Sequence, residues 1–141
     1  MRIERSLVII KPDAVERGLV GQIIKHFEKA DVHIKAIKIM NLDRKKAEDF
    51  YAEHEGKDFF ESLVSYITSA PIVAMIIEGT GCVEKAREII GKTSPQEAEE
   101  GTIRRLYAIS KDKNSVHASD SKYSALREVN CIFNEEVNQV A

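Results

Sequence analysis

The sequence predicts an α+β fold, a ferredoxin-like βαββαβ sandwich with a four-stranded antiparallel sheet and added helices. Three apolar runs, at residues 6–10, 33–40 and 71–78, are typical of strands. Stretches with apolar residues at helical spacing separate them, and a short segment near Val116 supplies the fourth strand before a last helix. This order predicts helices on one face of a mostly antiparallel sheet.

Length and composition support one globular domain. The chain has 141 residues, enough for one core and too few for two ordinary ones, so we expect a single domain over residues 1–141. Hydrophobic residues make up 43% and charged residues 31%, which excludes the disordered and membrane classes. The net charge of -2 gives no general attraction to nucleic acid. A polyanionic ligand must therefore meet locally gathered Lys and Arg side chains.

Cysteine usage and the N-terminal residues indicate a cytoplasmic protein. Cys82 and Cys131 lie far apart and have no metal-ligand spacing, so neither a zinc site nor a disulfide framework is indicated. Residues 1–5 lack the apolar run of a signal peptide, and no stretch is apolar enough to span a bilayer. We expect no membrane partner and no specific nucleic acid.

The first half of the chain alternates strands and helices. The run at residues 6–10 is aliphatic and is closed by Pro12, which predicts a strand buried on both faces with Lys11 at its end. Helical spacing of apolar residues predicts a helix over residues 19–29. Residues 33–40 alternate in part and predict a second strand with a polar solvent side.

Two more helices follow. Asp43 is the predicted N-cap of a helix to about Glu53, and the next helix carries an apolar stripe broad enough to meet a partner or ligand. For Tyr51 and Phe59 the simpler alternative is core packing, as for most aromatic residues at helical spacing. His54, among charged and polar neighbours, is interpreted as a surface residue.

The strand at residues 71–78 is the clearest in the chain and is predicted to be central. A Gly-x-Gly turn leads into a helix over residues 83–90, and it lacks the third glycine of a dinucleotide fingerprint. Residues 92–114 have no sustained period, and an irregular stretch of that length in a small domain is more often functional than idle. Residues from Glu135 onward are interpreted as a tail.

Several common nucleotide and metal motifs are absent. The chain has no Walker loop and no His-Glu-x-x-His. Residues 119–122 match the Ser-x-x-Lys motif of penicillin-binding enzymes. This match is rejected because the chain is too short and because the Lys-Thr pair at residues 92–93 precedes the motif, the reverse of the order in those enzymes. Four cations could hold a triphosphate if the fold gathers them. They are Lys11, Arg87, Arg104 and Arg105.

Residues 114–121 place one imidazole, that of His117, among small polar side chains. A helix from a Ser121 cap to about Asn130 follows, with Glu128 on it. We interpret His117 as a nucleophile that briefly carries a phosphoryl group. For this stretch alone the simpler alternative is that the Ser-Asp-Ser triplet only caps the helix.

Motifs in a characteristic order make the chain resemble a nucleoside diphosphate kinase along nearly its whole length. They are Ile-Lys-Pro-Asp-Ala-Val at 10–15, Phe-Tyr-Ala-Glu-His at 50–54, Phe-Phe at 59–60 with Leu63, Ala-Pro-Ile-Val-Ala-Met at 70–75, Gly-Thr-Ile-Arg at 101–104 and Asn-x-x-His-x-Ser-Asp-Ser at 114–121. The resemblance implies ping-pong transfer of a γ-phosphoryl group from a nucleoside triphosphate to His117 and then to a nucleoside diphosphate.

The resemblance also implies a role for each matching residue. The implied catalytic residues are His117, Lys11, Tyr51, Asn114, Glu128 and Ser119. Lys11 and Asn114 would contact the sugar hydroxyls and the transferring phosphate, Tyr51 would reach that phosphate or His117, and Glu128 and Ser119 would orient a neutral His117.

The implied nucleotide-binding residues are Lys11, Phe59, Leu63, Arg87, Thr93, Arg104 and Asn114. The two arginines and Thr93 would hold the remaining phosphates, and Phe59 would stack on the base with Leu63 behind it. Stacking tolerates any base, so we expect broad nucleotide specificity. Mg²⁺ would arrive on the nucleotide phosphates, with no metal ligand from the protein alone. Family members form tetramers or hexamers, and we expect a homo-oligomer, with a hexamer favoured.

The sequence departs from the family pattern at three places. Residues 105–107 are Arg-Leu-Tyr where Gly-Asp-Phe is usual, Ala118 replaces a glycine, and Lys111 stands where an apolar residue often flanks the base. The altered loop motivates an alternative, a nucleotide-binding regulatory or scaffold protein with little turnover. An interaction domain without a nucleotide site would leave the motifs unexplained.

Overall fold

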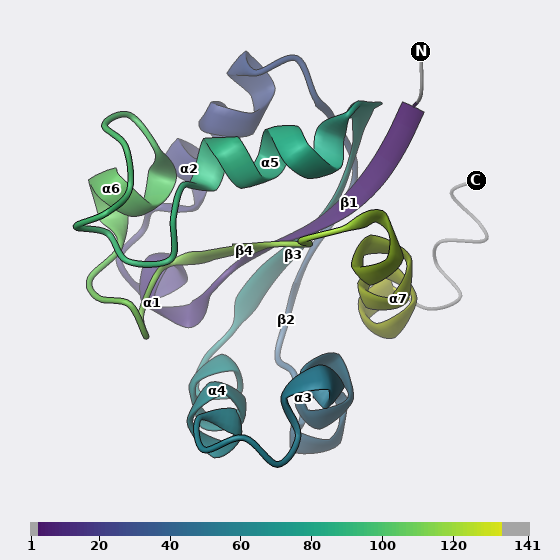
Figure 1. Ribbon diagram of the computed structural model, residues 1–141, viewed down its shortest axis with the longest axis vertical. Coiled ribbons are helices and arrows are strands. Elements are labelled where there is room, and N and C mark those ends of the chain that lie inside the picture. Colours follow the sequence, from purple (N-terminus) through teal and green to yellow (C-terminus); the bar gives the residue numbers. More distant parts are fainter. Residues whose placement is uncertain (1–2, 134–141) are drawn as a thin grey trace.

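The structure, a computed structural model, describes residues 3–133 (Figure 1). Four antiparallel strands form one sheet in the order β2-β3-β1-β4. They are β1 (Ile3–Ile10), β2 (His33–Met40), β3 (Ile72–Thr80) and β4 (Val116–Ala118). The predicted α+β fold and its four-stranded antiparallel sheet are confirmed, and the run expected to be central, β3, lies inside the sheet.

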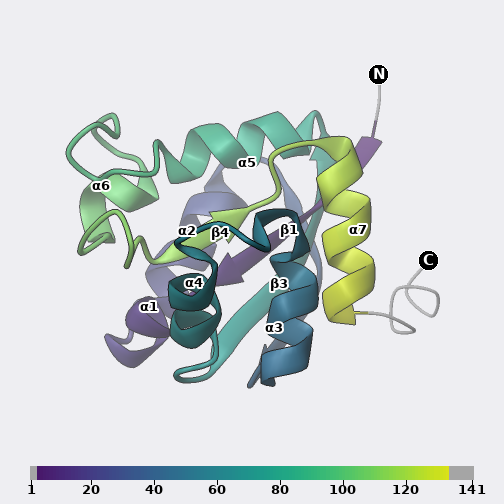
Figure 2. The same ribbon diagram turned by 60° about the horizontal axis from the view of Figure 1, so that its bottom comes forward.

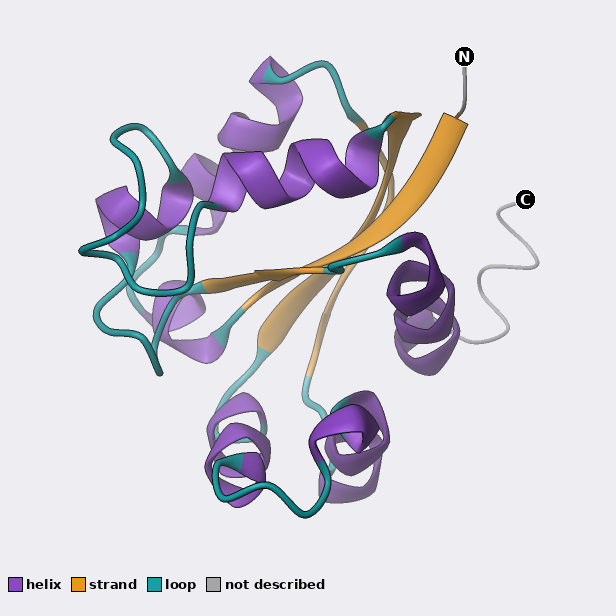
Figure 3. Ribbon diagram, in the orientation of Figure 1, coloured by secondary structure: helices purple, strands orange, loops and turns teal. Residues whose placement is uncertain are grey.

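Helices and one 3₁₀ turn connect the strands (Figure 3). They are α1 (Pro12–Glu16), α2 (Val20–Lys29), α3 (Arg44–Phe50), η1 (Ala52–His54), α4 (Phe60–Ile67), α5 (Cys82–Ile90), α6 (Ile103–Tyr107) and α7 (Lys122–Phe133). None of the helices in the described part of the chain is long and apolar enough to cross a bilayer.

The helices cover both faces of the sheet, so the expectation of helices on one face is wrong. Val8 and Ile10 of β1 belong to one core cluster, with residues of α2, α5 and α6. Leu7 and Ile9 belong to a second cluster, with residues of α3, α4 and α7. Successive side chains of a strand point to opposite faces, and β1 and β3 are apolar on both. A second helical layer is therefore needed to bury them.

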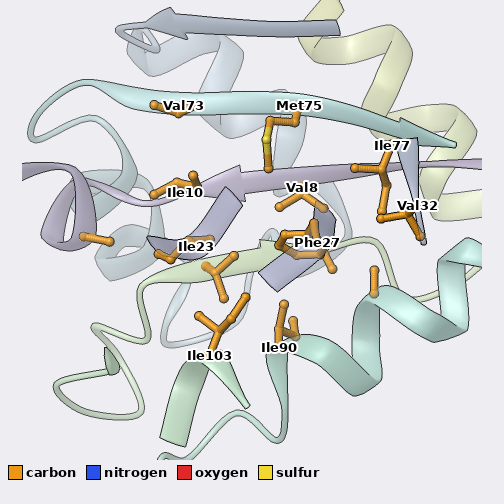
Figure 4. Close-up of a cluster of buried hydrophobic side chains, with 14 of the residues drawn as sticks. Val8, Ile10, Ile23, Phe27, Val32, Val73, Met75, Ile77, Ile90 and Ile103 are labelled. Carbon is orange, nitrogen blue, oxygen red and sulfur yellow. The ribbon is translucent and has the colours of Figure 1, made fainter. Parts of the chain in front are cut away.

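Figure 4 shows the first of these clusters, with Phe27 of α2 beside Val8 and with Ile90 and Ile103 below. In Figure 1 the second cluster lies on the other side of the sheet, where α3, α4 and α7 gather. All five residues from Ser6 to Ile10 of β1 are buried. The two clusters therefore cover both faces of this half of the strand.

Two short helices were missed by the sequence analysis. Pro12 begins α1 directly after β1, since proline suits the first turn of a helix. Thr102 caps α6 by accepting a hydrogen bond from the Arg105 backbone, inside the stretch expected to be irregular. Helices of five residues are too short to show an apolar period.

Other boundaries differ by a few residues. Asp43 caps α3 as expected, but α3 ends at Phe50 and the chain continues as η1. The last helix runs on to Phe133. The tail expected from Glu135 onward lies outside the described residues.

Candidate active site

A cavity of about 800 Å³ is lined by Lys11 after β1 and by side chains from residues 50–66, 87–93, 111–120 and 124–128. Its volume lies within the range of small-molecule sites. Among the predicted site residues, those that line it are Lys11, Tyr51, Phe59, Leu63, Arg87, Thr93, Asn114, His117 and Glu128. In Figure 2, β4 lies between α5 above it and α4 below it.

His117 is held at the cavity by β4 and α7. The strand pairs it with Ile9 of β1, and its Nε2 lies 2.7 Å from Oε1 of Glu128. An ionised carboxylate can only accept a hydrogen bond, so this contact places the ring hydrogen on Nε2. Nδ1 then carries no hydrogen, and its lone pair is available. The Ser119 hydroxyl donates to the same Glu128 oxygen at 2.8 Å. The ring thus has one fixed tautomer and one fixed plane.

The environment favours the neutral imidazole. Burial lowers the pKa of His117 below its usual value, and the cations Lys11 and Arg104 lower it further, while the Glu128 carboxylate opposes both. The net pKa shift is downward, so the ring is unprotonated at neutral pH. A neutral imidazole with a free nitrogen is a nucleophile.

Lys11 lies at the end of β1, where Pro12 stops the strand. Its ammonium donates to the Asn114 side-chain oxygen at 2.8 Å. Burial, together with the nearby charge of Arg104, lowers the pKa of Lys11 to about 7, and Asp13 opposes the shift. An anionic ligand in the cavity would restore the full positive charge of this ammonium.

A hydrogen-bond network around Asp13 holds the loop that carries Asn114. Ser115 adopts a left-handed backbone with φ of 72°. Its hydroxyl donates to Asp13 at 2.6 Å, and Arg17 donates to the same carboxylate oxygen at 3.0 Å. Arg17 also donates to the Tyr107 carbonyl at 2.7 Å, so α1, α6 and the loop are joined.

Arg104 is close to the site but does not line the cavity. Its guanidinium donates to the carbonyls of Gly91 and Val116, at 3.1 and 3.0 Å, and only 4% of the residue is exposed. Burial lowers the pKa of Arg104 to about 10, with a contribution from Arg87, so it stays charged at neutral pH. Its positive charge lowers the pKa of His117, and its hydrogen bond to the Val116 carbonyl holds β4 in place.

The other predicted cations divide between the cavity and the surrounding loops. Arg87 lines the cavity and donates to the Ala118 carbonyl at 3.1 Å. Arg105 donates to the Gln96 carbonyl at 3.0 Å, which ties α6 to residues 92–97 and keeps Arg105 out of the cavity lining. Lys111, at the position usually apolar, does line the cavity.

The structure decides the alternatives left open for the aromatic residues. Phe59 is 47% exposed at the cavity, so core packing does not explain it. Tyr51 lines the cavity and is also part of a core cluster, where burial and the Glu128 charge raise the pKa of its hydroxyl. His54, expected at the surface, is half-buried with its ring 5.3 Å from that of Phe59. It lines the cavity too.

Further lining residues were not singled out from the sequence, including Phe50, Asp120 and Arg127. Phe50 meets the His117 ring edge-to-face at 5.2 Å between centroids. Phe50 opens the motif at residues 50–54, but it was given no site role because an apolar residue at helical spacing is indistinguishable from core.

Known proteins match the chain over most of its length. The sequence model of the nucleoside diphosphate kinase family matches residues 4–137. A nucleoside diphosphate kinase of Staphylothermus marinus is 52% identical over 136 residues, which cover 96% of each chain. One from Actinobacillus pleuropneumoniae is 50% identical over 131 residues, covering 93% of this chain and 95% of that one.

Solved structures agree. The nucleoside diphosphate kinase of Aquifex aeolicus has a TM-score of 0.92 and 41% identity, covering 94% of this chain and 96% of its own. That of Halobacterium salinarum, solved in complex with CDP, has a TM-score of 0.92 and 39% identity, covering 96% of this chain and 90% of its own. With this coverage and identity, the chain belongs to the nucleoside diphosphate kinase family of phosphotransferases.

Proposed function

We propose that His117 is the residue that carries the phosphoryl group in the nucleoside diphosphate kinase reaction of this chain. In that reaction a γ-phosphoryl group passes from a nucleoside triphosphate to the enzyme and then to a nucleoside diphosphate. The observation that carries the assignment is the Nε2 contact with Glu128, which leaves Nδ1 as the nitrogen with a free lone pair at the cavity.

Each half-reaction forms one bond to the transferred phosphorus and breaks one. The Nδ1 lone pair forms a bond to the γ-phosphorus while the bond from that phosphorus to the β-phosphate oxygen breaks, and the diphosphate leaves with the electron pair. An oxygen of the second diphosphate then attacks the same phosphorus and the P–N bond breaks. Glu128 accepts the Nε2 hydrogen bond throughout, and it stabilises the positive charge that develops on the ring.

The remaining residues position the phosphates. We assign Lys11 and Asn114, joined at 2.8 Å, to the sugar hydroxyls and the transferring phosphate, with Tyr51 reaching that phosphate or the ring. Arg87 and Thr93 bind the other phosphates from the opposite wall. Arg104 supports them as a buried charge behind β4.

The base end of the cavity is its exposed rim. Phe59, with an exposed ring, stacks on the base, and Leu63 lies behind it. Stacking of this kind is tolerant of base identity, so we infer broad specificity. Lys111, which also lines the cavity, is the cationic neighbour that the family pattern does not have.

Mg²⁺ is the divalent ion we assign to the reaction. The part of the chain that the structure describes holds no group of three or more His, Cys, Asp or Glu side chains suited to a metal. Asp120 lines the cavity and fits an ion that keeps its water shell and enters on the nucleotide. Bound to phosphate oxygens, Mg²⁺ supplies positive charge during transfer.

We also infer a cytoplasmic homo-oligomer built from one domain over residues 1–141. Ile37 and Ile39, on the edge strand β2, are 50% and 74% exposed, which favours burial against another copy. A hexamer is our first expectation and a tetramer the second. Cys82 and Cys131 are free thiols, which suits a reducing compartment.

The assignment of His117 is tested by intact-mass spectrometry after brief mixing with Mg²⁺ and ATP and an alkaline quench. We expect one phosphoryl adduct, lost on a GDP chase and absent in His117→Ala. Bound ATP without an adduct would contradict the assignment. It would instead support a nucleotide-binding regulatory or scaffold protein.

A further inference from the structure

Two neighbouring residues of α7 line the cavity and contact different elements. Glu128 contacts the His117 ring at 2.7 Å. Arg127 turns toward α3 and donates from Nη1 to the Asp49 carbonyl at 3.1 Å and from Nη2 to the Phe50 carbonyl at 2.9 Å. Its Nε lies 3.4 Å from a carboxylate oxygen of Glu53. Figure 2 shows α3 and α7 running side by side.

The two carbonyls belong to the last residues of α3. Carbonyls at a helix C-terminus lack partners within the helix, and the dipole makes this end favourable for a cation. Arg127 supplies the positive charge, and its planar guanidinium can donate to two adjacent carbonyls at once. A lysine at this position could keep the charge but not the two-point contact.

The end of α3 carries the aromatic wall of the site. The Phe50 ring meets the His117 ring edge-to-face at 5.2 Å, and the Tyr51 ring meets Phe50 at 5.0 Å. The chain of ring contacts continues through His54 to Phe59. Any rotation of the last turn of α3 would therefore move the surface on which the imidazole rests.

We propose that Arg127 is a positioning residue for phosphoryl transfer, which locks the end of α3 so that Phe50 holds the His117 ring in its attacking orientation. This inference rests on the proposed role of His117. Glu128 fixes the ring by its Nε2, and Arg127 fixes the end of α3 that carries the Phe50 ring in edge-to-face contact with it. One helix thus sets both contacts of the nucleophile.

The test compares Arg127→Met and Arg127→Lys with Arg44→Met. Arg44 lies at the other end of α3 and pairs with Glu48 and Glu61 on the surface, so Arg44→Met removes the same charge without touching the site. For each variant we would first measure the thermal midpoint. The rate of phosphohistidine formation at saturating ATP and the KM for nucleotide would then be measured at a temperature well below that midpoint.

We expect Arg127→Met to lower the rate of phosphohistidine formation by about 10-fold or more, because small displacements of reacting groups cost rate, with KM changed by less than about threefold. Arg127→Lys should recover part of this loss. Arg44→Met should keep the wild-type rate.

Two results would overturn the inference. One is a wild-type rate in Arg127→Met, and the other is a raised KM at an unchanged rate, which would make Arg127 a nucleotide ligand. If Arg127→Met fails to fold, Arg127→Lys decides, since a wild-type rate there removes the need for the two-point contact. Failure of the proposed function is distinct, because the wild-type protein would then form no adduct at all.

Discussion

His117, the proposed nucleophile, is held by one hydrogen bond from Nε2 to Glu128 and by a ring contact with Phe50. The carboxylate does two things there. It selects the tautomer, and it opposes the lowering of the pKa of His117 that burial causes. Both effects come from one oxygen, which also accepts from Ser119.

Replacing Glu128 by glutamine removes the negative charge of the side chain and keeps its size and shape. We expect Glu128→Gln to lower the pKa of His117 further, because the raising influence of the carboxylate is lost while burial stays. The rate of phosphohistidine formation should fall by about 10- to 100-fold, the usual cost of losing a group that orients a reactive imidazole. An NMR titration of the His117 ring gives the pKa. A pKa equal to or above the wild-type value would contradict the account.

With Lys11 in its proposed role at the phosphates, we expect nucleotide binding to depend on pH. Its pKa is lowered to about 7 by burial, so part of the free protein has a neutral amine at neutral pH and more of it at higher pH. Nucleotide phosphates favour the charged form and raise the pKa of Lys11 again. Binding of ADP at about pH 8 should therefore take up protons.

The proton uptake can be measured by calorimetry in buffers of different ionisation enthalpy. In Lys11→Met the uptake at about pH 8 should largely disappear, because the titrating amine is gone. The same uptake in Lys11→Met as in the wild type would show that another group takes the proton.

At the scale of elements, the junction between α5 and α6 depends on Gly91. Its φ is 87°, and a Cβ there would lie 2.6 Å from the Thr102 hydroxyl oxygen. Its carbonyl accepts from the buried Arg104. The glycine thus brings the cap of α6 close to the end of α5 and fixes the arginine that holds β4.

We expect Gly91→Ala to destabilise the fold by about 2–4 kcal/mol, from the left-handed backbone and the close contact together. Gly18→Ala is the matched control, since Gly18 has a φ of 72° and nothing within 4 Å of an added Cβ. It should cost about 1 kcal/mol. Urea unfolding of both variants measures the difference, and equal losses would show that the Thr102 contact has no effect.

At the scale of the whole molecule, the sheet leaves one long edge strand with apolar side chains in solvent. Ile37 and Ile39 of β2 are 50% and 74% exposed, whereas β1 and β3 are covered on both faces. An exposed apolar edge invites pairing with another chain. In an assembled protein this edge would be buried.

Ile39→Lys should therefore weaken self-association and shift the protein to smaller species in sedimentation experiments, because a buried charge at an interface is costly. Leu126→Lys, at a residue of α7 that is 71% exposed, places the same charge on an apolar surface residue elsewhere. It should leave the assembly unchanged. An Ile39→Lys protein of wild-type size would contradict a role for β2 in assembly.

Much of the architecture could be predicted from the sequence because it is local. The strands were located by apolar runs, and Asp43 and Ser121 marked helix starts where the structure has them. The helices α1 and α6 were missed because five residues carry no period. The expectation of helices on one face of the sheet was also wrong, although the continuous apolar runs at residues 7–10 of β1 and 72–77 of β3 held the signal for two covered faces.

The sequence by itself determined the fold class, the family and the residue types of the site, since these lie in short motifs and their order. Only the tertiary structure decided which of those residues meet. Arg104 is turned onto backbone carbonyls behind β4, His54 joins the cavity, and Arg127 reaches the Phe50 carbonyl across 77 positions of chain. Such contacts depend on how helices pack on the sheet, and no local pattern encodes a partner so distant along the chain.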